Sequence, residues 1–281
     1  MTAYLTEEVV LSDEDFARIS QMVYDHCGIN LHDGKKELIR SRLAKKLRSG
    51  KFRTFSDYME HIQQDETGRE FSDFIDTLST NLTSFFRENQ HFEYVQNTLL
   101  PRLIEKKQKE KNPRIRAWSA GCSSGEEPYS IAITLLDNLP PGTWDTRILA
   151  TDISTRVLEK AKSGIYDAER VAPVPAPQKA KYLVSKSERG QRVYEVHKSL
   201  RDRITFRYLN LMEDWPIKGP LDFIFCRNVM IYFDKPTQAK LVGRYFNLLD
   251  SGGILFTGHS ESLTGIEHKF KYVQPTIYMK P

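Results

Sequence analysis

The spacing of apolar residues divides the chain into two parts. Between residues 13 and 79, apolar side chains recur every three or four positions, the periodicity of amphipathic helices. We expect these helices at residues 13–27, 35–49, 55–64 and 68–79. Three pairs have the spacing of a capping box: Ser12 with Asp15, Thr54 with Asp57, and Thr67 with Glu70. The pattern therefore predicts a small all-α domain at the amino terminus.

From Arg114 onward, short apolar segments alternate with amphipathic ones, which is typical of a parallel α/β sheet. Strands are expected at 115–119, 147–152, 204–210, 221–226 and 253–257, with helices at 90–108, 128–139, 154–162 and 236–249. The long connection between Gly164 and Ile204 contains the alternating segment "RVYEVH", so we predict a small antiparallel β-subdomain inserted at about 166–202. The terminal segment "FKYVQPTIYMKP" predicts an edge hairpin. We expect domains at 1–88, linker included, and 89–281.

Composition narrows the class of protein. The 281 residues are 40% hydrophobic and 28% charged, which is ordinary for a globular protein. No apolar run approaches the roughly 18 residues of a membrane span, and "MTAYLTEEVV" lacks the regions of a secretion signal. The three cysteines are odd in number and far apart. We therefore expect a cytoplasmic protein without membrane insertion, disulfide framework or metal site.

One segment, "AWSAGCSSGEEPYSIA", has the pattern of a strand, a tight turn and a helix. Gly121 and Gly125 allow the sharp bend and a close approach to a ligand. A helix start of this kind normally attracts phosphate, but Glu126 and Glu127 would repel it. The turn thus predicts a ligand without phosphates that tolerates nearby acid.

Ligands of such sheets bind beyond the carboxyl ends of the strands. That rule selects the glycine turn, Asp152, Asn210 and the pair Arg227–Asn228. A carboxylate placed like Asp152 suits the hydroxyls of a ribose. A nucleoside that carries positive charge and no phosphate fits this set, and S-adenosylmethionine is such a nucleoside. Glu127, or alternatively Glu126, would lie beside its cationic end, which predicts a methyltransferase-like fold.

A basic helix is expected at residues 35–49. Its apolar stripe is Ile39, Leu43 and Leu47, and the rest of its surface is cationic. The cations that we single out are Lys36, Arg40, Lys46 and Arg48. Such a surface is either a solvated face or a docking site for nucleic acid or an acidic protein helix.

The segments "NLTSFFRE", "SAGCSSGEEPYSIA", "DFIFCRNVMIYFD" and "GGILFTGHSE" resemble, in order and spacing, the motifs of CheR-type chemotaxis receptor methyltransferases. The resemblance covers nearly the whole chain. It implies a Rossmann-like class I S-adenosylmethionine-dependent methyltransferase sheet with an all-α amino-terminal domain and a β-insert. It also implies an enzyme that methylates glutamate side chains on the cytoplasmic helical bundle of bacterial chemoreceptors. Such an enzyme would be recruited to membrane-bound receptor arrays for sensory adaptation.

The motif match also implies site residues. Contacts to S-adenosylmethionine, and to its product S-adenosylhomocysteine, are expected from Asn81, Thr83, Arg87, Glu127, Asp152, Asn210, Leu211, Arg227 and Asn228, together with Gly121 of the turn. Arg87 or Arg227 would hold a carboxylate, either the cofactor's or the substrate's. Tyr232 lies four residues past Asn228, so it either lines the methyl-transfer channel or packs as an aromatic side chain at the strand end. The resemblance favours the basic helix as the receptor-binding surface. No strong general base is needed, because a glutamate nucleophile is already ionised at neutral pH.

Two other functions compete with this interpretation. A nucleic-acid methyltransferase would use the basic helix, but "KKELIRSRLAKKLRS" contains no aromatic residue for stacking on bases. The segment "CRNVMIYF" also differs from the Asn/Asp-Pro-Pro-aromatic loop of many amino-methylating enzymes. A non-catalytic cofactor sensor is the second alternative, although every strand-end position is filled. The pattern does not indicate the oligomeric state.

Overall fold

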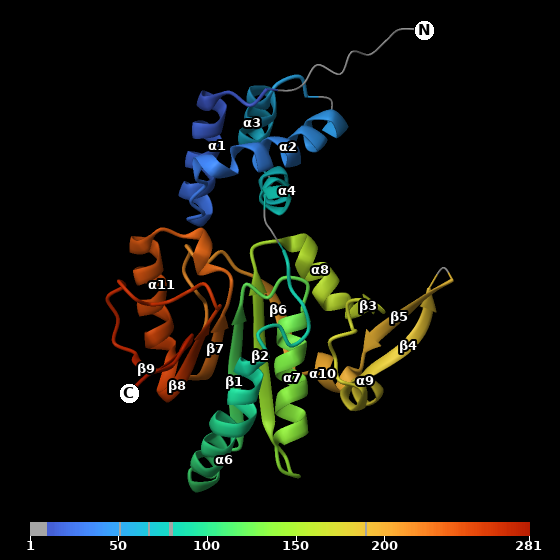
Figure 1. Ribbon diagram of the computed structural model, residues 1–281, viewed down its shortest axis with the longest axis vertical. Helices are drawn as coiled ribbons and strands as arrows, with labels where there is room; N and C mark the ends of the chain where they lie inside the picture. Colours follow the sequence, from blue (N-terminus) through green and yellow to red (C-terminus); the bar gives the residue numbers. More distant parts are fainter. Residues whose placement is uncertain (1–9, 51, 67, 79–80, 189) are drawn as a thin grey trace. The chain divides into compact units, whose positions relative to one another are not determined.

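The computed structural model describes residues 10–50, 52–66, 68–78, 81–188 and 190–281 (Figure 1). These described residues form two compact units, one from the range 1–80 together with 232–234 and one from the ranges 81–231 and 235–281. The linker 81–88, which we expected with the helical domain, therefore groups with the sheet.

Helices form the first unit. Its elements are α1 (Asp13–Cys27), the 3₁₀ turn η1 (Asp33–Lys35), α2 (Lys36–Gly50), α3 (Phe55–Gln64) and α4 (Arg69–Leu78). Ser12 caps α1 by accepting from the Asp15 amide at 2.9 Å, and Thr54 with Asp57 forms the predicted capping box of α3. The third predicted pair includes Thr67, which lies outside the described residues. The apolar stripe of α2 is fully buried, as its spacing predicts.

The second unit contains a seven-stranded sheet in the order β6-β2-β1-β7-β8-β10-β9. The first five strands of that order run parallel, and β10 pairs antiparallel with β8 and β9. Their bounds are β1 (Arg114–Ala120), β2 (Asp145–Asp152), β6 (Ile204–Tyr208), β7 (Leu221–Cys226), β8 (Leu249–Thr257), β9 (Lys271–Gln274) and β10 (Ile277–Met279). All five predicted strands and the terminal hairpin are confirmed.

The strand order indicates where a ligand would bind on this sheet. The chain proceeds from β1 outward to β2 and β6, then returns to the other side of β1 with β7 and β8. The order reverses between β1 and β7, and ligands of open sheets bind at such a reversal. The central strands carry large side chains that are completely buried: Trp118, Phe223, Phe225 and Phe256.

Helices pack beside this sheet (Figure 1). They are α7 (Glu126–Asn138), α8 (Thr155–Ser163), α11 (Lys235–Leu248), and the segment α5 (Gln90–Tyr94), η2 (Val95–Leu99) and α6 (Leu100–Lys109). The helix predicted at 90–108 is present, but η2 is a π-helical turn within it. Short η3 (Met230–Tyr232) follows β7.

The predicted insert forms a separate three-stranded antiparallel sheet in the order β3-β5-β4. Its elements are β3 (Ile165–Asp167), α9 (Ala176–Tyr182), β4 (Leu183–Glu188), β5 (Gln191–Val196) and α10 (Lys198–Arg201). Figure 1 shows it standing apart from the main sheet, beyond α8. Sheet, insert and helical domain together confirm the predicted fold class.

Candidate functional site

The carboxyl ends of four parallel strands meet at one edge of the sheet. Ala120 of β1 pairs with Thr151 of β2 and Cys226 of β7, and Asp152 pairs with Tyr208 of β6. The residues that follow these strands are the predicted ones: the turn after Gly121, Asp152 itself, Asn210 with Leu211, and Arg227 with Asn228. The topology therefore brings most of the predicted cofactor residues to one edge.

The turn after β1 requires both of its glycines. Gly121 has φ +82°, and a Cβ there would lie 2.3 Å from Cγ2 of Val229. Gly125 has φ +98°, and its Cβ would lie 2.8 Å from the Tyr166 hydroxyl and 2.9 Å from Cβ of Ala161. Left-handed backbone and tight neighbours both exclude larger residues.

The first three amides of this turn already have acceptors within the protein. Gly121 and Cys122 both donate to the Thr151 carbonyl, at 2.8 and 2.9 Å. The Ser123 amide donates to Oδ2 of Asp152 at 2.8 Å. A phosphate-binding turn presents such amides to its ligand. The amides of Gly121, Cys122 and Ser123 are therefore not available to hold a phosphate.

The two glutamates at the start of α7 have different partners. Glu126 is fully buried, and its carboxylate accepts from Arg170 Nη1 at 2.5 Å and from Ser124 Oγ at 2.7 Å. Its charge is compensated by Arg170, so it is not left for a ligand. The sequence had left the choice between the two acids open, and this geometry favours Glu127.

Glu127 faces the strand ends. Its Oε1 accepts from Ser119 Oγ at 2.6 Å, and its Oε2 lies 3.6 Å from Nη1 of Arg227. Burial raises the pKa of Glu127, although the nearby Arg227 and Arg87 cations oppose that shift. A further cation beside Glu127 would offset its desolvation, which is what an ammonium group supplies.

Asp152 ends β2 with its carboxylate held by the backbone. Its Oδ2 accepts from the Ser123 amide, and its Oδ1 accepts from the Ser154 amide at 2.9 Å. A carboxylate oxygen accepts more than one hydrogen bond, so Asp152 can also accept from the hydroxyls of a ribose. The two amides orient the carboxylate for that role.

Asn210 and Leu211, which follow β6 after Leu209, are both buried. Oδ1 of Asn210 accepts from the Met212 amide at 3.0 Å, and its Nδ2 lies 3.3 Å from Oε1 of Glu213. The Leu211 carbonyl accepts from Trp215 and Arg244 side chains. These contacts shape a rigid turn beside Asp152.

The linker 81–88 also reaches the strand ends. The Asn81 carbonyl accepts from Ser123 Oγ at 3.2 Å, and Thr83 is half-buried. Arg87 donates to the Leu82 carbonyl at 2.7 Å, while its own carbonyl accepts from Arg227. The linker is thus joined to both the glycine turn and the end of β7.

Arg227 is a buried cation between two acids. Its Nη2 lies 3.3 Å from Oε2 of Glu88, and its Nη1 faces Glu127. Its guanidinium also packs over the rings of Phe92 and Phe225. Sequence reasoning did not assign Glu88 a role, although it is the acid of the quoted segment "NLTSFFRE".

Glu261 is the second residue that sequence reasoning missed. Its buried carboxylate accepts from the amides of Asn228, Gly258 and Ile231, at 2.8, 2.6 and 3.1 Å. Asn228 has φ +58°, a conformation that costs energy outside glycine. Glu261 therefore fixes the left-handed turn that presents Asn228. The signal was present in the segment "GHSE", whose acid follows β8.

Tyr232 and the basic helix belong to the helical unit. The Tyr232 carbonyl accepts from the Asn30 amide at 2.8 Å, and Lys35 Nζ lies 5.1 Å from its ring centre. The structure therefore does not group Tyr232 with the strand-end residues. In α2, the predicted partner-binding cations have acidic partners in three cases: Lys36 with Asp13, Arg40 with Glu37, and Lys46 with Asp73. Arg48 is exposed.

Within the described ranges, no helix combines the length and apolar character needed to cross a bilayer.

Comparison with known proteins identifies the family of this chain. Residues 81–279 match the family described as "CheR methyltransferase, SAM binding domain", and residues 14–79 match "CheR methyltransferase, all-alpha domain". The "Chemotaxis protein methyltransferase" of Escherichia coli (strain K12) is 40% identical over 98% of this chain and 93% of its own length. "Chemotaxis protein methyltransferase 2" of Pseudomonas aeruginosa is 40% identical, over 97% and 95% respectively. The "Chemotaxis protein methyltransferase" of Borreliella burgdorferi is 39% identical over 96% of this chain and 95% of its own length. The chain therefore belongs to the CheR methyltransferase family, with an S-adenosylmethionine-binding methyltransferase domain at residues 81–279.

Proposed function

We propose that this methyltransferase transfers the methyl group of S-adenosylmethionine to glutamate side chains of bacterial chemoreceptors. The product would be a glutamate methyl ester that adjusts receptor signalling. The observation that carries the proposal is the strand-end edge, which presents Glu127 and Asp152 while the amides of Gly121, Cys122 and Ser123 donate to acceptors within the protein. The full-length similarity to chemotaxis protein methyltransferases supports the choice of substrate.

We assign the cofactor to this edge. Asp152 would accept hydrogen bonds from the ribose, and Glu127 would accept them from the ammonium group. Asn210 and Leu211 would contact the cofactor from the end of β6, and Arg227 with Asn228 from the end of β7. Asn81 and Thr83 would close over it from the linker, with Gly121 allowing close approach. Bound there, S-adenosylmethionine would supply the methyl group that is transferred.

The protein's part in the reaction is mainly orientation. A receptor glutamate is ionised at neutral pH and can attack without losing a proton. Aligning its oxygen with the methyl group can supply much of the rate enhancement. We assign Arg87 to hold a carboxylate of the cofactor or the substrate, since its charge already acts on Glu127. Tyr232 is proposed as a channel residue only because it lies four residues past Asn228 in the sequence.

The receptor would be recognised as an acidic helical bundle. Lys36, Arg40, Lys46 and Arg48 of α2 would attract it, with no role for nucleic acid. The enzyme would act from the cytoplasm at membrane-bound receptor arrays. Exposed cations mainly accelerate encounter, and salt screens them over about 8 Å at physiological ionic strength.

The test uses the full-length protein, labelled S-adenosylmethionine and a cytoplasmic fragment of a chemoreceptor. We expect label on glutamates that base releases, and none on a fragment whose methyl-accepting glutamates are replaced by alanine. The rate should be nearly flat from about pH 6.5 to about pH 8, because no group must lose a proton. Label in bulk RNA would support the nucleic-acid alternative, and cofactor binding without transfer would support a sensor.

A further inference from the structure

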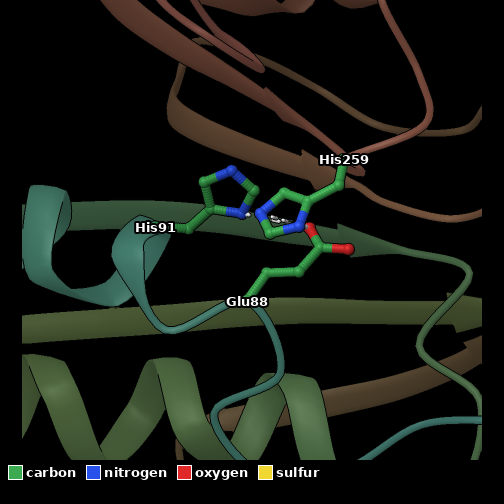
Figure 2. Close-up of side chains that lie close together, drawn as sticks. All are labelled: Glu88, His91 and His259. Atoms are coloured by element: carbon green, nitrogen blue, oxygen red, sulfur yellow. Dashed lines mark ion pairs between the residues drawn. The ribbon is translucent and has the colours of Figure 1, made fainter.

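Three side chains from separate segments lie close together, and one of them, Glu88, contacts Arg227. Glu88 ends the linker, His91 lies in α5, and His259 follows β8 (Figure 2). One oxygen or nitrogen of each lies within 4.8 Å of the others. Oε2 of Glu88 is 3.6 Å from Nδ1 of His91 and 3.8 Å from Nε2 of His259. We refer to these three residues as the Glu88 cluster.

The hydrogen bonds of His91 determine which of its nitrogens carries the proton. Its Nε2 lies 2.7 Å from Oγ1 of Thr276, and that hydroxyl donates its only proton to the Pro275 carbonyl at 2.6 Å. Nε2 must therefore be the donor, which leaves Nδ1 as a bare electron pair. His91 is completely buried, and Nδ1 has no hydrogen-bond partner in the described structure.

The other two members also present electron pairs. Oε2 of Glu88 is buried and forms no hydrogen bond with any described residue, although Arg227 lies 3.3 Å away. Nε2 of His259 contacts Nε2 of Gln90, an amide nitrogen that can only donate, so the imidazole nitrogen is an acceptor. Three acceptors thus face a common point. Two of them, Oε2 of Glu88 and Nδ1 of His91, are buried without a hydrogen-bond donor, which is rare and calls for an explanation.

We propose that the Glu88 cluster binds a divalent transition-metal ion, for which Zn²⁺ is the best candidate. Two imidazoles and a carboxylate are an established ligand set for zinc, with a fourth position left open. Bonds of about 2.0–2.2 Å in a tetrahedron require ligand atoms roughly 3.3 Å apart. The two distances to Glu88 are close to that value. His259 is half-exposed and can move inward by giving up Gln90.

Some neighbours of the Glu88 cluster favour metal binding, and one neighbour opposes it. Thr276 fixes the ring of His91 in the way that a second partner orients metal-bound histidines. Asn228 Nδ2 lies 3.3 Å from Oε1 of Glu88 and orients the carboxylate. Arg227 opposes the ion by its charge, so we expect weaker binding than at a zinc site without a neighbouring cation.

The experiment measures metal binding by the chelator-treated full-length protein and needs no methyl transfer. Calorimetric titration with Zn²⁺ should give one site, and Co²⁺ should give the visible absorption of tetrahedral coordination. His259→Gln should weaken Zn²⁺ binding by about tenfold or more. His32→Gln, which removes an exposed histidine outside the cluster, should leave it unchanged. Gln90→Ala should bind at least as tightly as the wild type.

The result that overturns the proposal is equally direct. Wild-type protein that binds no Zn²⁺ would refute the site, as would His259→Gln with wild-type affinity. Thermal unfolding gives an independent reading, because bound metal should raise the Tm of the wild type and of His32→Gln but not that of His259→Gln. A common shift in all three would assign the metal to another place.

Discussion

Replacing Gly121 by alanine should destabilise the sheet unit for two separable reasons. The residue has φ +82°, and a Cβ in left-handed backbone costs about 1–2 kcal/mol. The added Cβ would also lie 2.3 Å from Cγ2 of Val229, and forced overpacking costs about 1–3 kcal/mol. Gly121→Ala should therefore lower the free energy of unfolding by about 2–5 kcal/mol.

Two further variants separate these contributions. Gly252→Ala places a Cβ at φ +76° with nothing within 4 Å, so it should show only the backbone cost. Val229→Ala removes the clashing methyl group, so the double variant should lose about 1–3 kcal/mol less than the sum of the single variants.

Urea unfolding followed by tryptophan fluorescence is a suitable assay. The three tryptophans, Trp118, Trp144 and Trp215, all belong to the sheet unit, so the signal reports its unfolding alone. If the loss in the double variant equals the sum of the two single losses to within about 0.5 kcal/mol, the clash with Val229 does not contribute to the destabilisation by Gly121→Ala. Equal losses in Gly121→Ala and Gly252→Ala would refute the packing argument as well.

Three other predictions concern binding, pH and charge. Asp152→Ala should weaken S-adenosylmethionine binding by about 1–3 kcal/mol, and unchanged calorimetric affinity would remove Asp152 from the site. Burial, with Arg227 and His259, lowers the pKa of His91 to about 3 from 6.5, so the unfolded chain binds the extra proton. Stability should therefore be complete above about pH 6.5 and decrease below it, by about 1.4 kcal/mol between pH 7.5 and 5.5. Urea unfolding of the chelator-treated protein at both pH values measures this loss, and the His91→Gln variant should not show it. Exchanging Lys36, Arg40 and Arg48 together for glutamate should raise the receptor KM at low salt, less so at high salt, with cofactor affinity unchanged. If the wild type and the triple variant show equal receptor kinetics at low salt, the cations of α2 form only a solvated surface.

Periodicity predicted the regular elements because local interactions decide them. The bounds of α1, α3 and β7 agree with the prediction residue for residue. In α1, the Ser12 cap and Gly28, which adopts φ +71°, mark both ends in the sequence itself. The π-helical turn at Val95–Leu99 has no such local signal, and the pattern predicted a uniform helix there.

The missed site residues share a physical cause. Glu88 and Glu261 act on groups 139 and 33 residues away, respectively, through buried contacts to Arg227 and Asn228. No spacing within a single element reports contacts of that kind. The same holds for the Glu88 cluster, whose members are scattered among three segments and contain no ligand motif. Only the assembled sheet brings such side chains together.

The structure also changes the reason why this glycine turn should reject phosphate. Sequence reasoning relied on repulsion from Glu126 and Glu127 together, but Arg170 compensates the charge of Glu126. The stronger obstacle is that the amides of Gly121 and Cys122 are committed to Thr151. A dinucleotide site offers donors at this position. Here the edge offers the acceptors Glu127 and Asp152 instead, and acceptors select a ligand that carries hydroxyl and ammonium groups.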